Sequence, residues 1–179
     1  MNKLKFVSLK TIDLKQNQIL SICKLKDTYW KWSLSSQLKW FKKNVKKSDI
    51  NNILELNGRL IGYTLLRQRK AIRKKKIIYY YYFDTLIIDP KFRKKGYGKK
   101  LMKYNNKVLN KLNYHAFLIC LKKNIGFYKK YNWQILYEKN FKLMDHKPAW
   151  FKNKKDIFGM TFGLNKKDKK KIYYFLYRV

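Results

Sequence analysis

The stretch Leu86-Ile87-Ile88-Asp89-Pro90-Lys91-Phe92-Arg93-Lys94-Lys95-Gly96-Tyr97-Gly98-Lys99-Lys100-Leu101 holds the most informative local pattern in the sequence. Its apolar beginning closes a run rich in Tyr and Ile, which predicts a strand over residues 77–89 that Pro90 ends. Its last residues open a predicted helix over residues 96–109, whose apolar positions follow a helical period. Two glycines and several basic residues stand where the strand gives way to the helix.

This junction is suited to holding a phosphate group. Two glycines spaced by one residue let successive backbone N–H groups face one concavity, and a helix N-terminus adds a favourable dipole. Each charge-assisted phosphate contact contributes about 1.5–3 kcal/mol. Gly-x-Gly also occurs in tight turns without a ligand, but the strand, the proline, the basic flank and the helix favour a ligand here. The predicted pyrophosphate-binding residues are Arg93, Lys94, Lys95, Gly96, Tyr97, Gly98 and Lys99.

Upstream of this junction, the clearest signal is a β-hairpin. Two strand-like runs in residues 53–66 flank Asn57-Gly58, the pair that a type I′ turn prefers. A first strand is predicted over residues 4–9, followed by a helix that Asp13 could cap and a second helix that starts at Ser33 or Ser35. The Lys-rich segment 70–76 is interpreted as a break before the long strand.

Downstream, strands and a short helix complete one domain. Strands are predicted over residues 116–121, 133–137, 141–144, 157–162 and 172–177, with a helix over 124–130. The length favours a single domain over residues 1–179. The predicted fold class is α/β (α+β), with a central, mixed and mostly antiparallel sheet flanked by about four helices.

This order of elements resembles that of the GNAT superfamily of acyl-CoA N-acyltransferases. The segment Arg93-Lys94-Lys95-Gly96-Tyr97-Gly98 is similar to the family signature R/Q-x-x-G-x-G/A, which also follows a strand and precedes a helix. The resemblance implies acetyl-CoA as the acyl donor. It also implies that the backbone of Leu86, Ile87 and Ile88 pairs with the pantetheine arm like an added strand. The likeness covers residues 53–133 well and the flanks only by element order.

A second segment, Phe127 to Trp133, resembles the family pattern F/L-Y-x-x-x-G-F/W. In such enzymes the tyrosine at the position of Tyr128 lies near the acetyl sulfur and is proposed to protonate the leaving thiolate, which suits a phenol of pKa about 10. Asn132 stands where Gly is usual, and Asn tolerates the left-handed conformation of a helix end. Leu121 stands where the family often has Asn. The alternative is that Tyr128, one of 15 tyrosines, only packs.

Asp84 is the candidate acid or base, because it interrupts an apolar and aromatic strand. It falls where aminoglycoside 2′-N-acetyltransferases, the branch that this chain resembles most, carry a Glu thought to act through water. Asp84 would be the catalytic base or would hold the substrate ammonium group. The alternative is a strand-edge acid neutralised by a lysine. His115 and His146 are alternative bases, each isolated in a polar stretch.

Composition limits the partners and the compartment. The 45 Lys and Arg against 10 Asp and Glu give a net charge of +35. An AT-rich genome explains many lysines but not the scarcity of acids, so a polyanionic or acidic partner is also considered. Cys23 and Cys120 form no disulfide or zinc pattern, no secretion signal is found and no apolar run could span a membrane, which predicts a cytoplasmic protein without a metal.

The sequence therefore predicts an enzyme that transfers an acetyl group from acetyl-CoA to a primary amine of a small molecule by direct attack. Acidic or neutral acceptors, such as amino sugars or nucleotide-linked amino sugars, fit the positive charge better than polycations. RNA- or protein-directed acylation and plain nucleic-acid binding are the alternatives, because the basic segments 70–76 and 166–171 precede Tyr-rich strands. A further alternative is binding of acyl-CoA without turnover. A homodimer is compatible with these expectations.

Overall fold

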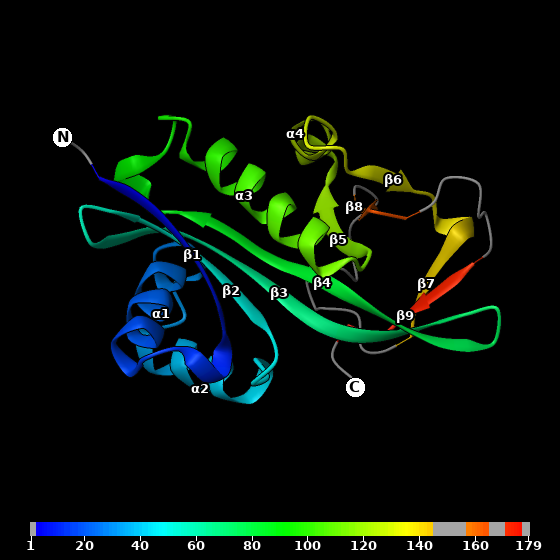
Figure 1. The fold of residues 1–179 in the computed structure, drawn as a ribbon, viewed down its shortest axis with the longest axis horizontal. Helices are drawn as coiled ribbons and strands as arrows, with labels where there is room; N and C mark the ends of the chain where they lie inside the picture. Colours follow the sequence, from blue (N-terminus) through cyan, green and yellow to red (C-terminus); the bar gives the residue numbers. More distant parts are fainter. Residues whose placement is uncertain (1–2, 145–156, 165–170, 177–179) are drawn as a thin grey trace. The chain divides into compact units, whose positions relative to one another are not determined.

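A computed structural model describes residues 3–144, 157–164 and 171–176 (Figure 1). Short 3-10 turns accompany the main elements: η1 (Thr11–Asp13), η2 (Pro90–Phe92), η3 (Lys122–Asn124) and η4 (Glu138–Asn140). The main elements are, in chain order, β1 (Leu4–Lys10), α1 (Gln16–Trp30), α2 (Leu34–Asn44), β2 (Ile50–Leu56), β3 (Arg59–Arg73), β4 (Lys76–Ile88), α3 (Tyr97–Leu112), β5 (Ala116–Leu121), α4 (Ile125–Lys129), β6 (Gln134–Leu136), β7 (Phe141–Leu143), β8 (Ile157–Phe162) and β9 (Ile172–Tyr174).

The strands form one mixed sheet with the order β1-β2-β3-β4-β5-β8-β6, and β9 pairs with β3 and β7. The β4–β5 and β7–β9 pairs are parallel, whereas β1–β2, β2–β3, β3–β9, β5–β8 and β6–β8 are antiparallel. The predicted mixed, mostly antiparallel sheet with four helices is thereby confirmed. Each described helix is too short or too polar to cross a bilayer.

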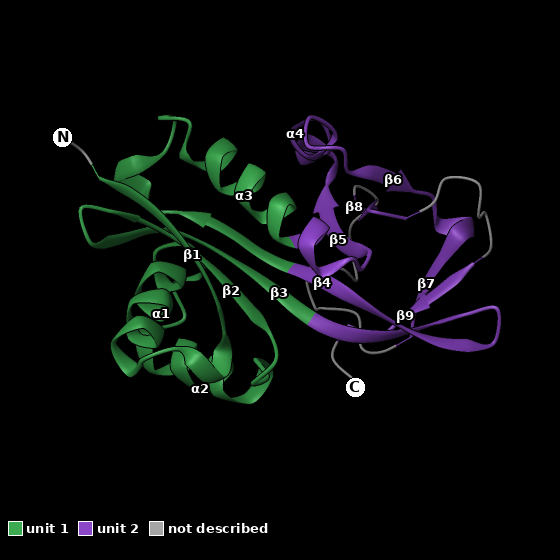
Figure 2. Ribbon diagram, viewed as in Figure 1, with its two compact units in different colours: residues 1–67, 84–108 green, residues 68–83, 109–179 purple. Residues whose placement is uncertain are grey.

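The chain divides into two compact units (Figure 2). Unit 1 contains residues 1–67 and 84–108, and unit 2 contains residues 68–83 and 109–179. The long strands β3 and β4 contribute one part to each unit, as does α3. Each unit has its own apolar core.

In unit 1, helices cover both faces of the strands (Figure 1). Helices α1 and α2 pack on one face through a cluster that includes Ile22, Phe41 and Tyr63. Helix α3 packs on the other face through Leu101. Buried Asn105 of α3 accepts hydrogen bonds from Asn52 of β2 at 2.9 Å and from Thr64 of β3 at 3.1 Å. These polar contacts fix α3 on the sheet, because breaking them would leave further buried polar atoms without a partner.

In unit 2, the core is largely aromatic. Phe117 of β5 and Tyr174 of β9 stack with ring centroids 4.1 Å apart, and Tyr80 of β4 meets Tyr174 edge to face at 4.7 Å. Strand β8 pairs with β5 over six residues and so extends the sheet beyond β5 in this unit. Offset and edge-to-face ring pairs add to the free energy gained by burying aromatic area.

Most predicted elements are confirmed to within a few residues, and two predictions were wrong. Ser33 caps α2, and Asn57-Gly58 forms the predicted hairpin turn. Asp13 does not cap α1: it lies in η1, and Gln18 instead accepts the Lys15 N–H at 2.9 Å. The basic segment 70–76 is not a break, because β3 continues to Arg73 and only Lys74 and Lys75 form a turn. Pairing of β3 with β9 sustains the strand there.

Candidate functional site

Asp89 fixes the junction between β4 and α3 in unit 1. Its backbone N–H donates to the Ile61 carbonyl at 2.8 Å, so the end of β4 is bonded to β3. Its carboxylate accepts the Lys91 N–H at 2.9 Å and the Arg59 guanidinium at 2.8 Å. Asp89 is buried, and these contacts satisfy its charge. The chain therefore turns at η2 and enters the loop before α3 in a defined direction.

The two glycines of the loop have different reasons to be glycine. Gly96 has φ +80°, a left-handed conformation that an L side chain adopts only with strain. Gly98 lies in α3, and a Cβ there would meet only Ile88 Cγ1, at 3.8 Å. The internal packing of the protein therefore leaves space at Gly98. A ligand such as a phosphate needs this space to approach the backbone N–H groups closely. The backbone around Gly98 therefore fits a phosphate.

The start of α3 provides unpaired backbone donors and nearby cations. The Lys100 N–H makes the first bond of the helix, to the Gly96 carbonyl at 3.2 Å. The N–H groups of residues 97–99 precede that bond and have no partner within the helix. Lys94, Lys95 and Lys99 are exposed beside them. The N–H groups, the helix dipole and these cations together suit a pyrophosphate.

The end of β4 presents its side chains to two different cores. Leu86 and Ile88 pack with the cluster under α3, whereas Ile87 packs with the cluster under α1 and α2. The described β4–β5 ladder consists of the pairs Tyr81↔Ala116 and Tyr82↔Phe117. Residues 86–88 lie beyond that ladder, while the Arg93 Nε donates to the Ile88 carbonyl at 3.1 Å. This arrangement is compatible with an extended ligand beside the strand end.

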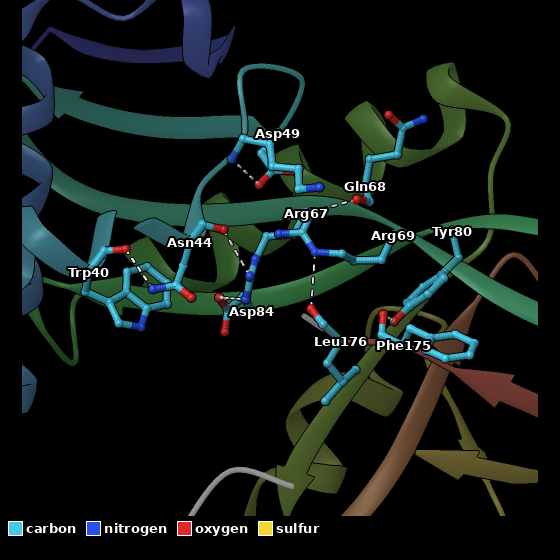
Figure 3. Close-up of polar contacts among 11 residues, drawn as sticks. Trp40, Asn44, Asp49, Arg67, Gln68, Arg69, Tyr80, Asp84, Phe175 and Leu176 are labelled. Carbon is cyan, nitrogen blue, oxygen red and sulfur yellow. Dashed lines mark hydrogen bonds and ion pairs between the residues drawn. The ribbon is translucent and has the colours of Figure 1, made fainter. Parts of the chain in front are cut away.

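Asp84 has a buried cationic partner (Figure 3). Its Oδ2 atom lies 3.2 Å from Nη1 of Arg67 on β3. The Arg67 Nη2 atom donates to the Asn44 carbonyl at the end of α2, at 3.0 Å. The Arg67 side chain is 2% exposed and the Asp84 side chain 18% exposed. The acid that the sequence analysis singled out is therefore held by an arginine and keeps some access to solvent.

The side chains of β4 do not alternate regularly between the two faces of the sheet after Asp84. Asp84 shares a face with Arg67, which follows Tyr63 and Leu65 at two-residue spacing on β3. Ile87, three residues after Asp84, packs in the same cluster as Tyr63 and Leu65. Residues on one face of a regular strand are separated by even numbers. An irregularity of the bulge kind therefore separates Asp84 from the strand end.

Lys26 of α1 is a second cation in this region. It is 2% exposed, and its Nζ atom lies 3.5 Å from the ring centroid of Trp40 and 5.4 Å from that of Trp30. Burial lowers the pKa of Lys26 from 10.5 to about 8, and the negative charge of Asp84 partly opposes this. The indole faces compensate part of the lost hydration. Asp84 thus faces two cations, Arg67 and Lys26.

Tyr128 lies in unit 2, on the short helix α4. Its ring meets Phe83, Phe127 and Trp133 at centroid distances of 6.2, 5.3 and 6.2 Å. Burial, together with the proximity of Cys120, raises the pKa of Tyr128 well above its ordinary value. The phenol therefore keeps its proton at neutral pH. Asn132, which follows α4, has φ +63°, the left-handed conformation expected where the family usually has Gly.

Of the alternative bases, His115 is placed in unit 2 and His146 lies outside the described residues. His115 stacks on Tyr80 at 5.7 Å. Burial and the nearby Arg73 lower its pKa to about 4, so the imidazole is neutral at pH 7. A neutral, stacked imidazole packed against Tyr80 has the surroundings of a structural histidine.

Sequence reasoning missed Lys26 and Arg67, although the sequence contained a signal for both. Arg67 continues the two-residue spacing of Tyr63 and Leu65, so the inward face of β3 carries a charge. Lys26 continues the helical spacing of the buried residues Ile22 and Cys23. A charged residue at an inward position of a strand or helix predicts a buried ion pair. The residue that forms the other half of the pair can be known only from the fold.

Comparisons with known proteins agree with this geometry. A family model described as acetyltransferase (GNAT) domain matches residues 49–135. No curated protein sequence matches the chain. An acyl-CoA N-acyltransferase from Pseudomonas aeruginosa has a similar structure, with TM-score 0.64 and 13% identity, covering 89% of this chain and 99% of that one. Escherichia coli ElaA gives TM-score 0.61, 11% identity and coverages of 89% and 99%.

The ribosomal-protein-S18-alanine N-acetyltransferase from Escherichia coli is similar too, with TM-score 0.58, 13% identity and coverages of 88% and 92%. The fold is therefore that of the acyl-CoA N-acyltransferases. The family match spans the hairpin, the junction of β4 with α3, and α4, so this part of the chain is similar to the GNAT acetyltransferases. The acyl donor of these enzymes is acetyl-CoA.

Proposed function

We propose that residues 1–179 form one acyltransferase domain that transfers the acetyl group of acetyl-CoA to a primary amine of a small molecule. The junction of β4 and α3 carries this proposal. Gly96 at φ +80°, the space beside Gly98 and the free N–H groups of α3 form a phosphate cradle. Exposed basic side chains surround it. Residues 86–88 would pair with the pantetheine arm, and Arg93, Lys94, Lys95, Gly96, Tyr97, Gly98 and Lys99 would hold the pyrophosphate.

The proposed chemistry is direct attack without an acyl-enzyme. Acetyl-CoA supplies an activated thioester, the amine nitrogen forms the new bond to its carbonyl carbon, and the carbon–sulfur bond breaks. The amine must lose a proton and the sulfur must gain one. As base, Asp84 takes the proton of the amine; in its alternative role it holds the acceptor in the ammonium form, and solvent takes the proton before the attack. Tyr128 gives its proton to the sulfur.

The surroundings of Asp84 support its part in holding the acceptor. Its Oδ2 atom is occupied by Arg67, and among the described residues no contact is found to Oδ1. An ammonium group could therefore bind Oδ1 while Arg67 keeps the carboxylate oriented. The raised pKa of Tyr128 keeps the phenol protonated at neutral pH but makes it a weaker acid toward a thiolate, so its assignment as proton donor rests on the match of residues 127–133 to the family pattern.

Charge points to the class of acceptor. The chain carries a net charge of +35, and both Arg67 and Lys26 lie beside Asp84. A polycation such as an aminoglycoside would be repelled. We therefore favour an acidic or neutral amine, with an amino sugar or a nucleotide-linked amino sugar as the leading candidates. We place the reaction in the cytoplasm, which agrees with the two buried free thiols, Cys23 and Cys120.

A protein amine is the second candidate. One similar structure is named as an alanine N-acetyltransferase of a ribosomal protein, and ribosomal assemblies are polyanionic. The same loop would bind acetyl-CoA in that case, so only the acceptor would differ.

The test is thiol release from acetyl-CoA by the full chain with a panel of amines. The panel contains a nucleotide-linked amino sugar, a free amino sugar, an aminoglycoside and a peptide with a free N-terminus. Release with the first two above the hydrolysis background is the expected result. Preference for the peptide would favour the second candidate. Tight CoA binding without release for any amine would refute the enzyme and leave a binding protein.

A further inference from the structure

We propose that the β3–β4 hairpin of unit 2 carries a second binding surface, specific for single-stranded nucleic acid. The surface consists of the exposed turn residues Lys74, Lys75 and Lys76 and the side chains of Lys70, Ile77, Tyr79 and Tyr114. None of them belongs to the loop proposed to bind acetyl-CoA or to the assigned catalytic groups. The inference therefore stands independently of the acetyl-transfer reaction.

The turn places lysines where the backbone does not favour them. Lys74 and Lys75 have φ +51° and +62°, the left-handed values of a type I′ turn. The β2–β3 hairpin uses Asn57 and Gly58 at such positions, with φ +51° and +76°. Codons for Asn are as rich in A and T as those for Lys, so base composition alone would allow Asn here as readily. Charge at this tip is therefore retained at a cost in backbone strain.

The strand that leaves the turn exposes an apolar and aromatic row. Ile77 is 63% and Tyr79 46% exposed, whereas Tyr80 is fully buried in the core on the other face. Tyr81, the next residue on this face, is only 5% exposed and meets Tyr114 edge to face at 5.9 Å, and Tyr114 is 44% exposed. The exposed rings of Tyr79 and Tyr114 therefore form the platform on which bases can stack.

Positive charge borders this platform. Lys74, Lys75 and Lys76 are exposed at the turn that precedes Ile77 and Tyr79 on β4, and Lys70 is half-buried on β3. Lys171 is exposed just before β9, whose Ile172 pairs with Arg73. Within the described part of unit 2, the only acidic residue is Glu138, in η4. This charge is suited to a polyanion, and exposed tyrosines beside lysines match bases and phosphates better than a lipid surface, where a larger aliphatic patch would be expected.

The experiment measures fluorescence anisotropy of labelled 20-mers of uridine RNA and thymidine DNA with the full chain between 50 and 200 mM KCl. Joint replacement Lys74→Gln, Lys75→Gln and Lys76→Gln should weaken binding at least tenfold at about 100 mM salt. It should also reduce the slope of log affinity against log salt by about 2, because three single-strand phosphate contacts are lost. The matched control replaces three exposed lysines of unit 1, Lys24, Lys39 and Lys47, by Gln and should weaken binding less than threefold.

A second pair of variants separates stacking from charge. Tyr79→Ala should weaken binding about tenfold, and Tyr79→Phe should retain it within about twofold, because the ring is kept. Equal losses in the two triple-lysine variants, or an unchanged affinity of Tyr79→Ala, would overturn the proposal in favour of net charge alone. Binding to phosphatidylserine vesicles that the hairpin variants abolish, with nucleic-acid binding unaffected, would overturn it in favour of a membrane. Tighter binding of one probe shows whether the bound nucleic acid is RNA or DNA. Circular dichroism checks that each variant folds.

Discussion

Two groups of cations in unit 1 differ in almost every physical respect. Around the loop of α3, Lys94, Lys95 and Lys99 are exposed and stand beside backbone N–H groups. Around Asp84, Arg67 and Lys26 are buried and make defined contacts with a carboxylate, a carbonyl and indole rings. We propose that the exposed group binds an anionic ligand, whereas the buried group pairs with an acid of the protein itself. Cations of the same charge thus differ in burial and in partner.

The largest effect is expected from a substitution in the backbone of the loop that carries the exposed lysines. Gly96→Glu forces a side chain into a left-handed position and places a negative charge beside the phosphates. We expect CoA affinity to fall at least about 100-fold, equivalent to one or two lost charge-assisted contacts. Isothermal titration calorimetry measures this. Gly58→Glu is the matched control, because Gly58 has φ +76° in the β2–β3 hairpin and is equally strained. Similar losses in both variants would show that the effect is on folding.

The buried group is broken by Arg67→Met, which removes the partner of Asp84. An acid that loses a buried cation destabilises the fold, and we expect the free energy of unfolding to fall by about 3 kcal/mol. Lys75→Met, at an exposed position of the other hairpin, should change it by less than about 0.5 kcal/mol. Urea denaturation distinguishes the two. A loss below about 1 kcal/mol for Arg67→Met would mean that the ion pair contributes little.

Tyr128 provides a test beside the two groups of cations, because its proposed role does not depend on a charge. Tyr128→Phe keeps the aromatic packing and removes the proton donor, so we expect kcat to fall about 100-fold while CoA affinity stays within about twofold. Tyr131→Phe, three residues on, serves as the control and should retain kcat. Steady-state kinetics and calorimetry on the same samples provide both values. An unchanged kcat in Tyr128→Phe would remove this tyrosine from the mechanism.

The smallest effect concerns the pH dependence of stability at Lys26. Its pKa is lowered from 10.5 to about 8 by burial, so between these pH values the unfolded chain holds a proton that the folded chain has released. The contribution of Lys26 to the free energy of unfolding therefore rises with pH in this window. We expect the gain in stability of Lys26→Met over the native chain to be about 2 kcal/mol larger at pH 7 than at pH 9.5.

The stability of the native chain must be subtracted from that of the variant at each pH, because other titrating groups oppose the rise in stability with pH. Burial raises the pKa of Cys23 to about 11, so its contribution to stability falls as pH rises from 9 to 11. Taking differences between variants removes the contributions of groups that Lys26 does not influence, whereas Cys23 is coupled to Lys26. Lys24→Met, at an exposed position of the same helix, is the control and should alter the difference by less than about 0.5 kcal/mol. A difference for Lys26→Met that does not vary with pH would contradict the lowered pKa.

Local patterns predicted the elements well, and interactions between distant segments explain the failures. Asn57-Gly58 and the alternation around it specify a hairpin within a few residues of chain, and the structure confirms it. The basic segment 70–76 was misinterpreted because lysine-rich runs usually end strands. Its continuation depends on pairing of residues 71–73 with β9, about 100 residues away. No local pattern contains that information.

By itself, the sequence determined the order of the elements, the glycine-bearing junction of β4 and α3, and the identity of the few acids able to act as a base. These features are local, because backbone conformation at glycines, strand alternation and helix periodicity depend on neighbouring residues. Only the tertiary structure decided that Arg67 pairs with Asp84, that Lys26 is buried against Trp40, and that Lys74 and Lys75 form a tight turn below exposed tyrosines. Burial and ion pairing depend on which elements pack together, and that depends on the whole fold.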